Sequence, residues 1–307
     1  EWDDATVSSQ FRLRVSFPRE AEAEAVGFRE PGAPEFHGRE DRRDDLVVTI
    51  DPEDARDHDD AIAVKALEGG RYEVGIHIAE ARARGTSCYL PGGVVPMLPE
   101  HLSADLCSLR EGKDRLALSV FAVLDDRGLL HEYRFAACVI RSRASLSYEQ
   151  VQQALDGDAP LPGALQQAVT TLMGLARSLR ARRFAVGALA IESLEVKAVV
   201  DERGQTLRMV RRPHLESHEL VEEFMLLANE TVAAHLEQHH VPSLYRVHEE
   251  PDPAKVEVFE EFISTLGYSL SASGAELAPR DFQKLVEKIA GKPEEKPIAF
   301  LMLRTMQ

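Results

Sequence analysis

The sequence predicts an α/β fold in which mixed sheets are surrounded by helices. Short apolar runs rich in Val and Ile alternate with turns in the first half of the chain, whereas long segments with helical spacing fill most of the second half. At 307 residues and 44% hydrophobic composition, the chain can bury a sizeable core. We therefore expect one large domain or two modest ones, with strands first and helices after them.

The predicted strands follow a charged, turn-rich segment, residues 1–44, which we interpret as an N-terminal extension or linker. Period-2 or continuous apolar runs bounded by turn residues identify the strands and hairpins. They are expected at 46–50, 62–67, 72–78, 116–140 and 194–210. The stretch 86–115 contains several prolines and a Gly-Gly pair, and it predicts a long ordered loop.

Helices are predicted where apolar residues recur every three or four positions. Ser147 and Gln150 have the spacing of a capping box, which marks the start of a helix. Longer helices are expected at 163–184, 216–239, 254–266 and 281–290. The helix at 216–239 is the clearest, because Leu220, Phe224 and Leu227 form one apolar stripe.

Composition restricts the possible partners and the compartment. A formal net charge of −16 argues against a general nucleic-acid coat, which needs Lys and Arg facing phosphates. The cysteines, Cys88, Cys107 and Cys138, are spaced for neither a zinc site nor a disulfide framework, which indicates a reducing compartment. No apolar run approaches the ~20 residues of a membrane span. We expect a cytoplasmic monomer with no membrane contact, and the absence of an initiator methionine indicates a fragment.

An acidic segment interrupts the predicted strands at residues 51–60, which read DPEDARDHDD. It holds six acidic residues and one arginine between two apolar runs, 46–50 and 61–64. Carboxylates placed so close together repel one another, and some of them resist ionisation. A hard divalent cation such as Mg²⁺ reverses this repulsion by taking oxygen ligands. The alternative is a solvated acidic loop without a ligand.

Other acidic or nucleotide-binding motifs fit this segment poorly. An EF-hand loop starting at Asp57 would place Ile62 where a glycine is required. Neither GxxxxGK[ST] nor GxGxxG occurs in the chain. A two-metal phosphodiesterase site remains, because Asp57 and Asp59 can point to one side of an extended segment, and Asp60 can meet Asp51 across the loop.

The string at residues 49–62 resembles the signature of the RNB family of 3′→5′ exoribonucleases, which includes ribonucleases II and R. Further strings fall in the family's order, at 76–80, 89–91, 95–99, 106–109, 221–225 and 244–248. The resemblance covers residues 45–307. It implies an RNB-type catalytic domain over that range.

The resemblance also implies a reaction and a site. The reaction is the hydrolysis of single-stranded RNA to 5′-nucleoside monophosphates, with two Mg²⁺ ions or, alternatively, Mn²⁺. The implied metal-binding and catalytic residues are Asp51, Asp57, Asp59 and Asp60. The implied RNA-binding residues are Tyr89, Tyr148 and Glu222. Each of the last three has an alternative role, in packing a loop, covering a helix start or lying solvated on a helix.

The chain departs from the family pattern in several places. His58 stands where Phe or Met is usual, Glu80 stands where Asp is usual, and Ile191 stands where the family has a stacking aromatic. The chain also ends at Gln307, before the family's arginine-containing segment and S1 domain, and the N-terminal cold-shock domains are not visible. Arg211 or Arg212 is a candidate to replace the arginine. These departures favour the alternative of a degenerate RNB-like protein that binds RNA or a protein partner without catalysis. A metal-buffering module is a third alternative, which the broken EF-hand pattern disfavours.

Overall fold

The computed structural model describes residues 16–80, 88–90, 93–96, 98–189, 196–201, 206–245, 251–270 and 278–306. Within these ranges, the side chains of 88–90, 93–95, 197, 198 and 200 are outside the description. The chain divides into two compact units. The first comprises Glu1–Ser178 and Leu194–Thr231, and the second comprises Leu179–Ser193 and Val232–Gln307.

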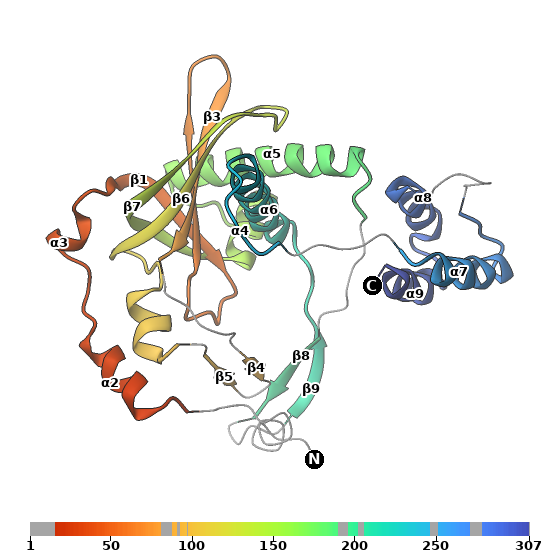
Figure 1. The fold of residues 1–307 in the computed structure, drawn as a ribbon, viewed down its shortest axis with the longest axis horizontal. Coiled ribbons are helices and arrows are strands. Elements are labelled where there is room, and N and C mark those ends of the chain that lie inside the picture. Colours follow the sequence, from red (N-terminus) through yellow and green to blue (C-terminus); the bar gives the residue numbers. More distant parts are fainter. Residues whose placement is uncertain are drawn as a thin grey trace. The chain divides into compact units, whose positions relative to one another are not determined.

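A closed five-stranded barrel forms the centre of the first unit (Figure 1). Its strands are β1 (Glu40–Asp51), β2 (Asp60–Ala66), β3 (Arg71–Ala79), β6 (Asp114–Asp125) and β7 (Leu130–Ser147). They pair in the order β1-β2-β3-β6-β7, antiparallel throughout except for the parallel pair of β1 and β7 that closes the barrel. The sheet is therefore mixed, as the sequence predicts.

The apolar runs of these strands fill the barrel. In β1 the stretch from Val47 to Ile50 is buried, whereas the charged first half of the strand is more exposed. One buried cluster brings together residues from four strands and from the segment before β6: Val47, Ala61, Ala63, Leu109, Ala117, Phe121, Cys138 and Ile140. Burial of this apolar surface is the main favourable contribution to the stability of the barrel.

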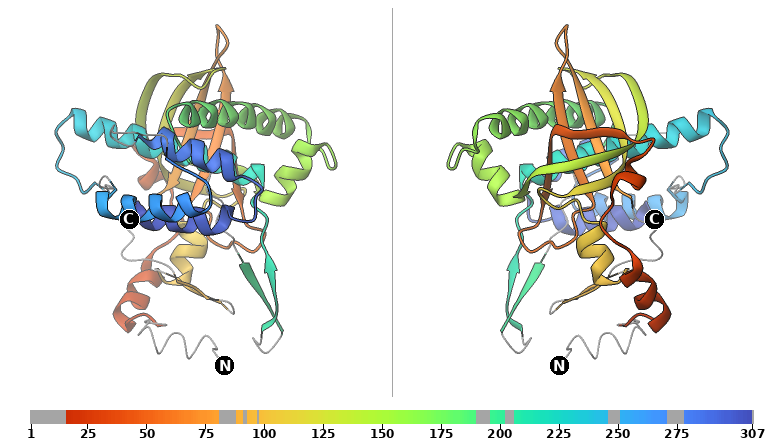
Figure 2. Two further views of the ribbon diagram at one scale, coloured as in Figure 1. Left: turned by 90° about the vertical axis from the view of Figure 1, so that its right-hand side faces the viewer. Right: turned by 90° about the vertical axis from the view of Figure 1, so that its left-hand side faces the viewer.

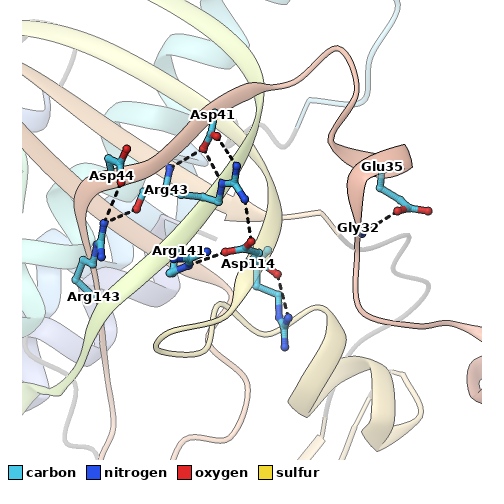
Figure 3. A network of polar contacts seen from close by, with 9 residues as sticks. Gly32, Glu35, Asp41, Arg43, Asp44, Asp114, Arg141 and Arg143 are labelled. Carbon is cyan, nitrogen blue, oxygen red and sulfur yellow. Dashed lines mark hydrogen bonds and ion pairs between the residues drawn. The ribbon is translucent and has the colours of Figure 1, made fainter.

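Polar side chains reinforce the parallel closure where its ladder is irregular. The register between β1 and β7 shifts between Arg42 and Val47. Around this shift, Arg43 pairs with both Asp41 and Asp114, and Asp114 also accepts a 2.6 Å bond from Arg141 (Figure 3). These contacts join β1, β6 and β7 at a point where backbone pairing alone is interrupted.

Strand register gathers several chain segments at one end of the barrel. Asp51 at the end of β1 is opposite Ser147 at the end of β7, and Asp60 at the start of β2 is opposite Ile78 near the end of β3. Ala79 is in turn opposite Ala117, near the start of β6. The acidic loop, the segment before β6 and the end of β7 therefore lie at the same end.

Helices and two small hairpins complete the first unit. They are α2 (Arg19–Gly27), α3 (Ala33–Phe36), β4 (Cys88–Leu90), β5 (Gly93–Val95), the π-helix η1 (Leu102–Leu106), α4 (Tyr148–Asp156), β8 (Val196–Val200) and β9 (Thr206–Arg211), with most of α5 (Gly163–Ala185) and α6 (Glu216–Gln238). The β8–β9 hairpin is a two-stranded sheet separate from the barrel (Figure 2). The predicted hairpin, the capping box at Ser147 and the helix at 216–239 are confirmed.

The second unit is helical. Its helices α7 (Pro253–Thr265), α8 (Pro279–Ile289) and α9 (Glu295–Thr305) share an apolar core of Val256, Phe259, Ile263, Leu270, Phe282, Leu285, Ile289, Ile298 and Met302. In the described part of the chain, no helix combines the length and the apolar character needed to cross a membrane. The division into an extension at 1–44 and a catalytic domain at 45–307 stays a prediction.

A buried histidine lies inside the barrel. His77 is 0% exposed, and its Nδ1 is 2.8 Å from Ser119 Oγ on the neighbouring strand. Its ring meets the edge of Phe121, and a Cβ on Gly75 would approach His77 Nε2 to 2.8 Å, so glycine makes room for the imidazole. Within the described residues Nε2 has no hydrogen-bond partner. Burial, helped by the charge of Arg42, lowers the pKa of His77 to about 3.

We expect acid to destabilise the barrel through His77. The unfolded chain binds a proton at this residue below about pH 6.5, whereas the folded barrel keeps the imidazole neutral because its pKa is lowered. The contribution of His77 to the free energy of unfolding should therefore fall as the pH drops below 6.5, by about 2 kcal/mol at pH 5. Urea unfolding of the wild type and of a variant without this imidazole, followed by circular dichroism at about pH 7.5 and pH 5, isolates this contribution.

The substitution His77→Gln should remove this part of the pH dependence. His37→Gln, which replaces an exposed histidine, should leave it in place. Equal pH dependence in the wild type and in His77→Gln would show that another group is responsible.

Candidate functional site

The acidic loop has two aspartates fixed by strand ends. Asp51 is the last residue of β1 and lies opposite Ser147, and Asp60 is the first residue of β2 and lies opposite Ile78. Both side chains are only partly exposed. Backbone pairing on both sides of the loop therefore fixes the main-chain positions from which these two carboxylate side chains extend.

The middle of the loop is held by backbone hydrogen bonds to neighbouring segments. His58 O accepts a 2.8 Å bond from Leu109 N, and Asp59 O accepts a 2.8 Å bond from Ala79 N. A local turn follows β1, in which Ala55 N donates to Pro52 O at 2.9 Å. These bonds bring the middle of the loop back towards the barrel, between the end of β3 and the segment before β6.

The aspartates of the loop repel one another. Burial raises the pKa of Asp59, and the charges of Asp57 and Asp51 raise it further. Burial also raises the pKa of Asp60 to about 6, with Asp51 and then Asp59 as the next contributors. Among the neighbouring charges, Asp57 thus contributes most to the raised pKa of Asp59, and Asp51 contributes most to that of Asp60. The four carboxylates form one coupled group of negative charge.

His58 hydrogen-bonds to one carboxylate of this group. Its Nδ1 is 2.6 Å from Asp51 Oδ2, and both side chains are largely buried. The hydrogen bond to Asp51 raises the pKa of His58, although burial acts in the opposite direction. One oxygen of Asp51 is therefore engaged by a side chain of the same loop.

The chemistry of the donor set fits a hard cation. Four aspartates supply carboxylate oxygens, the ligands that Mg²⁺ and Mn²⁺ prefer, and their mutual repulsion is what a cation would relieve. Across the described ranges, however, no three His, Cys, Asp or Glu side chains converge closely enough to hold a metal ion. Binding therefore requires the carboxylates to move together.

An aromatic pair lies beside the loop. Tyr148, the first residue of α4, stacks on His218 of α6 with ring centroids 3.9 Å apart and planes 13° from parallel. Leu215 N donates a 3.1 Å hydrogen bond to His218 Nδ1, which fixes the orientation of the imidazole. The stack therefore joins α4 to α6 next to the end of β1.

The environment of Tyr148 links four of the predicted site residues. Burial raises the pKa of Tyr148 to about 12, and the negative charges of Asp60, Asp51 and Glu222 contribute to the shift. Glu222 is exposed on α6, and its Oε1 lies 3.8 Å from His214 Nε2. Tyr148, Glu222 and the two aspartates at the strand ends thus share one neighbourhood, whereas their roles stay predictions.

The structure describes fewer contacts for the other residues expected from the sequence. Arg212 lies close enough for its positive charge to act on both Tyr148 and His218. Tyr89 belongs to β4, but its side chain is outside the described residues, as is the whole of Ile191.

A pocket of about 540 Å³ opens beside the loop. Its walls come from the loop, the end of β7 and the first turns of α4: Asp51, Pro52, Glu53, Ala55, His58, Ser145, Leu146, Ser147, Glu149, Gln150 and Gln153. Five of these eleven residues carry a carboxylate or an amide group. The pocket lies within the first unit and adjoins the carboxylate group at Asp51.

Two contributors to the site were missed in the sequence. His218 stands four residues before Glu222, a spacing that places both on one face of α6 and could have indicated it. Ser108 belongs to a string that already fitted the family's order. It lies 50 residues from His58 in the sequence, so sequence spacing did not reveal its contact with the loop.

The first unit is a closed barrel that carries four aspartates on one loop, and comparison with known proteins identifies the family of the chain. The family model described as the RNB domain matches residues 39–307. The chain therefore belongs to the RNB family. Ribonuclease R of Aquifex aeolicus is 38% identical over 316 residues, an alignment that covers 97% of this chain and 44% of that protein. The chain thus spans less than half the length of this relative.

Solved structures share the fold. Mycoplasma genitalium RNase R in complex with ribose methylated single-stranded RNA has a TM-score of 0.92 and 25% identity, covering 99% of this chain and 50% of that one. Yeast Ssd1, described as a pseudonuclease, has a TM-score of 0.71 and 22% identity, covering 90% of this chain and 35% of that one. At the latter identity the likeness concerns the fold alone. The fold therefore occurs in both a nuclease and a pseudonuclease, and the side chains must distinguish them.

Replacing the most strongly perturbed carboxylate should stabilise the metal-free chain. Asp60→Asn keeps the shape of the side chain and removes a charge that burial and neighbouring aspartates disfavour. The raised pKa destabilises the fold increasingly as the pH rises from about 4 to 6, and fully above 6. We expect Asp60→Asn to be about 2 kcal/mol more stable than the wild type at pH 7.5 and no more stable at pH 4.

Urea unfolding with EDTA present measures this effect. Glu53→Gln, an exposed change in the same loop, is the matched control and should alter stability little at either pH. A wild type as stable as Asp60→Asn at pH 7.5 would contradict the electrostatic interpretation.

Proposed function

We propose that this protein is a Mg²⁺-dependent 3′→5′ exoribonuclease that hydrolyses single-stranded RNA to 5′-nucleoside monophosphates. The observation that carries the proposal is the loop of four mutually repelling aspartates at one end of the barrel, in a chain of the RNB family. Such a charge is unfavourable without a cation, and a two-metal phosphodiesterase requires it. The similar RNase R of Mycoplasma genitalium was solved with single-stranded RNA, which supports this class of substrate.

In the proposed reaction, the aspartates would hold two divalent ions, which when bound polarise the attacking water and stabilise charge on the leaving oxygen. Asp51 and Asp60 would bind from the strand ends, and Asp57 and Asp59 from the loop between them. This arrangement offers carboxylate oxygens from several directions while leaving room for phosphate oxygens. Mn²⁺ has the same ligand preference and is the alternative ion.

The remaining residues would orient the RNA. With its pKa raised to about 12, Tyr148 stays protonated at neutral pH and offers a hydroxyl donor beside the carboxylates. Glu222 offers an exposed acceptor for a ribose hydroxyl, a contact that would favour RNA over DNA. Tyr89 would stack near the 3′ end, where stacking accepts any base. Since these residues all belong to the first unit of one chain, a monomer suffices. From the spacing of the cysteines we infer a reducing, cytoplasmic compartment.

The proposal is tested by incubating a 5′-labelled single-stranded RNA with the chain, with and without Mg²⁺. We expect a ladder of shortened RNA only when metal is present. Asp59→Asn should lower the rate by at least about a hundredfold, because it removes a carboxylate from the metal-binding group. Glu53→Gln, which lies in the same loop outside the four aspartates, should retain activity within about threefold.

Intact RNA with the wild type would rule out the enzyme. If the wild type then still bound RNA in a gel-shift assay, the second candidate would hold, an RNB-like protein that binds RNA without catalysis. The shared fold of yeast Ssd1 is the observation that keeps this candidate.

The hydrogen bond between His58 and Asp51 should weaken metal binding. It occupies one oxygen of a proposed ligand at 2.6 Å, and a hydrogen bond to a charged group contributes about 1.5–3 kcal/mol. We therefore expect His58→Phe to bind Mn²⁺ about tenfold more tightly, measured by the electron paramagnetic resonance signal of free Mn²⁺.

His131→Phe is the matched control. His131 also pairs with a carboxylate, Asp125 at 3.1 Å, but at the opposite end of the barrel, so its replacement should leave Mn²⁺ affinity unchanged. Weaker Mn²⁺ binding by His58→Phe would instead mean that the imidazole is itself a ligand.

A further inference from the structure

A buried serine hydroxyl bridges two peptide groups of the acidic loop. Ser108 is 0% exposed and lies between the π-helix η1 and β6. Its Oγ accepts a 3.0 Å hydrogen bond from His58 N and lies 3.4 Å from Arg56 O, to which it donates. The two bonded peptide groups stand on either side of Asp57. The hydroxyl therefore sets the path of the loop where Asp57 leaves it.

The adjacent residue adds a second contact to the same part of the loop. Leu109 N donates a 2.8 Å bond to His58 O, so His58 is held through both its N–H and its carbonyl. The Leu109 side chain is 1% exposed and belongs to the buried cluster inside the barrel, with Val47 and Phe121. The segment that holds the loop is thus itself fixed in the core.

A buried arginine fixes Ser108 from the other side. Arg115 is 1% exposed, and its Nε donates a 2.9 Å bond to Ser108 O. Its two terminal nitrogens donate to Asp114 O at 3.0 Å and to Asp105 Oδ1 at 3.2 Å. With three directions of the guanidinium engaged, the backbone at Ser108 has little freedom to move relative to β6.

We infer that Ser108 is a positioning residue for the proposed metal site: its hydroxyl holds the loop so that the carboxylates of Asp57 and Asp59 stay near each other and can converge on cations. The inference rests on the proposed function. Asp57 and Asp59 flank His58, the residue that Ser108 and Leu109 hold on both sides. Because the two carboxylates repel each other, a loop released from Ser108 relaxes in the direction that separates them. Ser108 touches neither substrate nor metal and acts through the backbone.

A purely structural role is the competing explanation, since loss of a buried hydrogen-bonding group costs about 1–3 kcal/mol wherever it occurs. The chain offers a matched control in Ser119, which is 3% exposed and bonds His77 inside the barrel at 2.8 Å. Ser108→Ala and Ser119→Ala remove the same group from similarly buried positions. A structural role affects the melting temperature of both variants, whereas a positioning role affects metal binding in Ser108→Ala alone.

Mn²⁺ binding, measured by electron paramagnetic resonance, separates the two explanations. We expect Ser108→Ala to raise the Kd for Mn²⁺ about tenfold, the usual effect of removing a group that orients metal ligands. Ser119→Ala should stay within about twofold of the wild type. In RNA shortening, Ser108→Ala should need about tenfold more Mg²⁺ for half-maximal rate, with the rate largely restored at saturating metal.

A third variant and a second readout keep the test decisive. Ser108→Cys keeps a donor and acceptor at this position, although weaker ones on a slightly larger side chain, and should be intermediate; it replaces Ser108→Ala if that variant does not fold. Hydrogen exchange by mass spectrometry should show faster exchange over residues 56–60 in Ser108→Ala but not in Ser119→Ala.

The outcomes distinguish the inference from the proposed function. A wild type that binds no Mn²⁺ and leaves RNA intact ends the proposed function, and the inference ends with it. A competent wild type with unchanged Mn²⁺ affinity in Ser108→Ala overturns the inference alone.

Discussion

Repulsion among the aspartates of one short loop is the constraint on which the rest of this site depends. Burial and like charge together raise the pKa of Asp60 to about 6 and also raise that of Asp59, so the folded chain carries an electrostatic cost at neutral pH. A loop under such repulsion would spread outward if it were free. The barrel prevents this by fixing both ends of the loop in strands and its middle against a buried segment. The concentrated negative charge of the loop therefore lowers the free energy of unfolding of the metal-free chain at neutral pH.

Closure of the barrel by two parallel strands determines what surrounds this charge. Because β7 runs alongside β1 in the same direction, its end delivers Ser147 and then Tyr148 to the side of Asp51. An antiparallel closing strand would have placed the start of α4 at the opposite end. The irregular register of this pair is reinforced by charged side chains, as in the contacts of Arg43 and Asp114. The topology thus couples the aromatic stack on α4 and α6 to the acidic loop.

Local sequence patterns predicted much of this structure, because strands, helices and helix caps are determined largely by residues that are close together in the sequence. The apolar run before Asp51 forms the buried half of β1, the capping box at Ser147 starts α4, and the apolar stripe of α6 is buried.

The expected linker at 1–44 contains α2 and α3, and β1 begins within it at Glu40. Only Ala25 of α2 is buried, so this helix has too weak an apolar face for periodicity to reveal. Helix α9 was also missed, although its Pro297 lies in the first turn, where proline is tolerated.

Contacts between distant segments could not be predicted in this way. The four aspartates were recognisable as a group because they are neighbours in sequence. Ser108, in contrast, reaches the loop through the pairing of β3 with β6, the burial of Leu109 and the hydrogen bond from Arg115. The same holds for the stack of Tyr148 on His218. These two residues are 70 positions apart in the sequence but adjacent in space. Sequence spacing therefore identifies which groups can bind a cation, and tertiary packing decides how they are held.

The two pairs of aspartates are held by different means, and this difference bears on the proposed metal binding. Asp51 and Asp60 sit where backbone ladders begin and end, so their main chains move only if the barrel moves, whereas their side chains can still turn towards a cation. Asp57 and Asp59 depend on the bonds at His58 and Asp59 to segments outside the loop. A yeast pseudonuclease shares this fold, so the barrel alone does not make an enzyme. For a metal-dependent nuclease, the loop must let its carboxylates converge on cations without letting them disperse when the cations leave. A rigid pair at the strand ends and a hydrogen-bonded pair on the loop together meet both requirements.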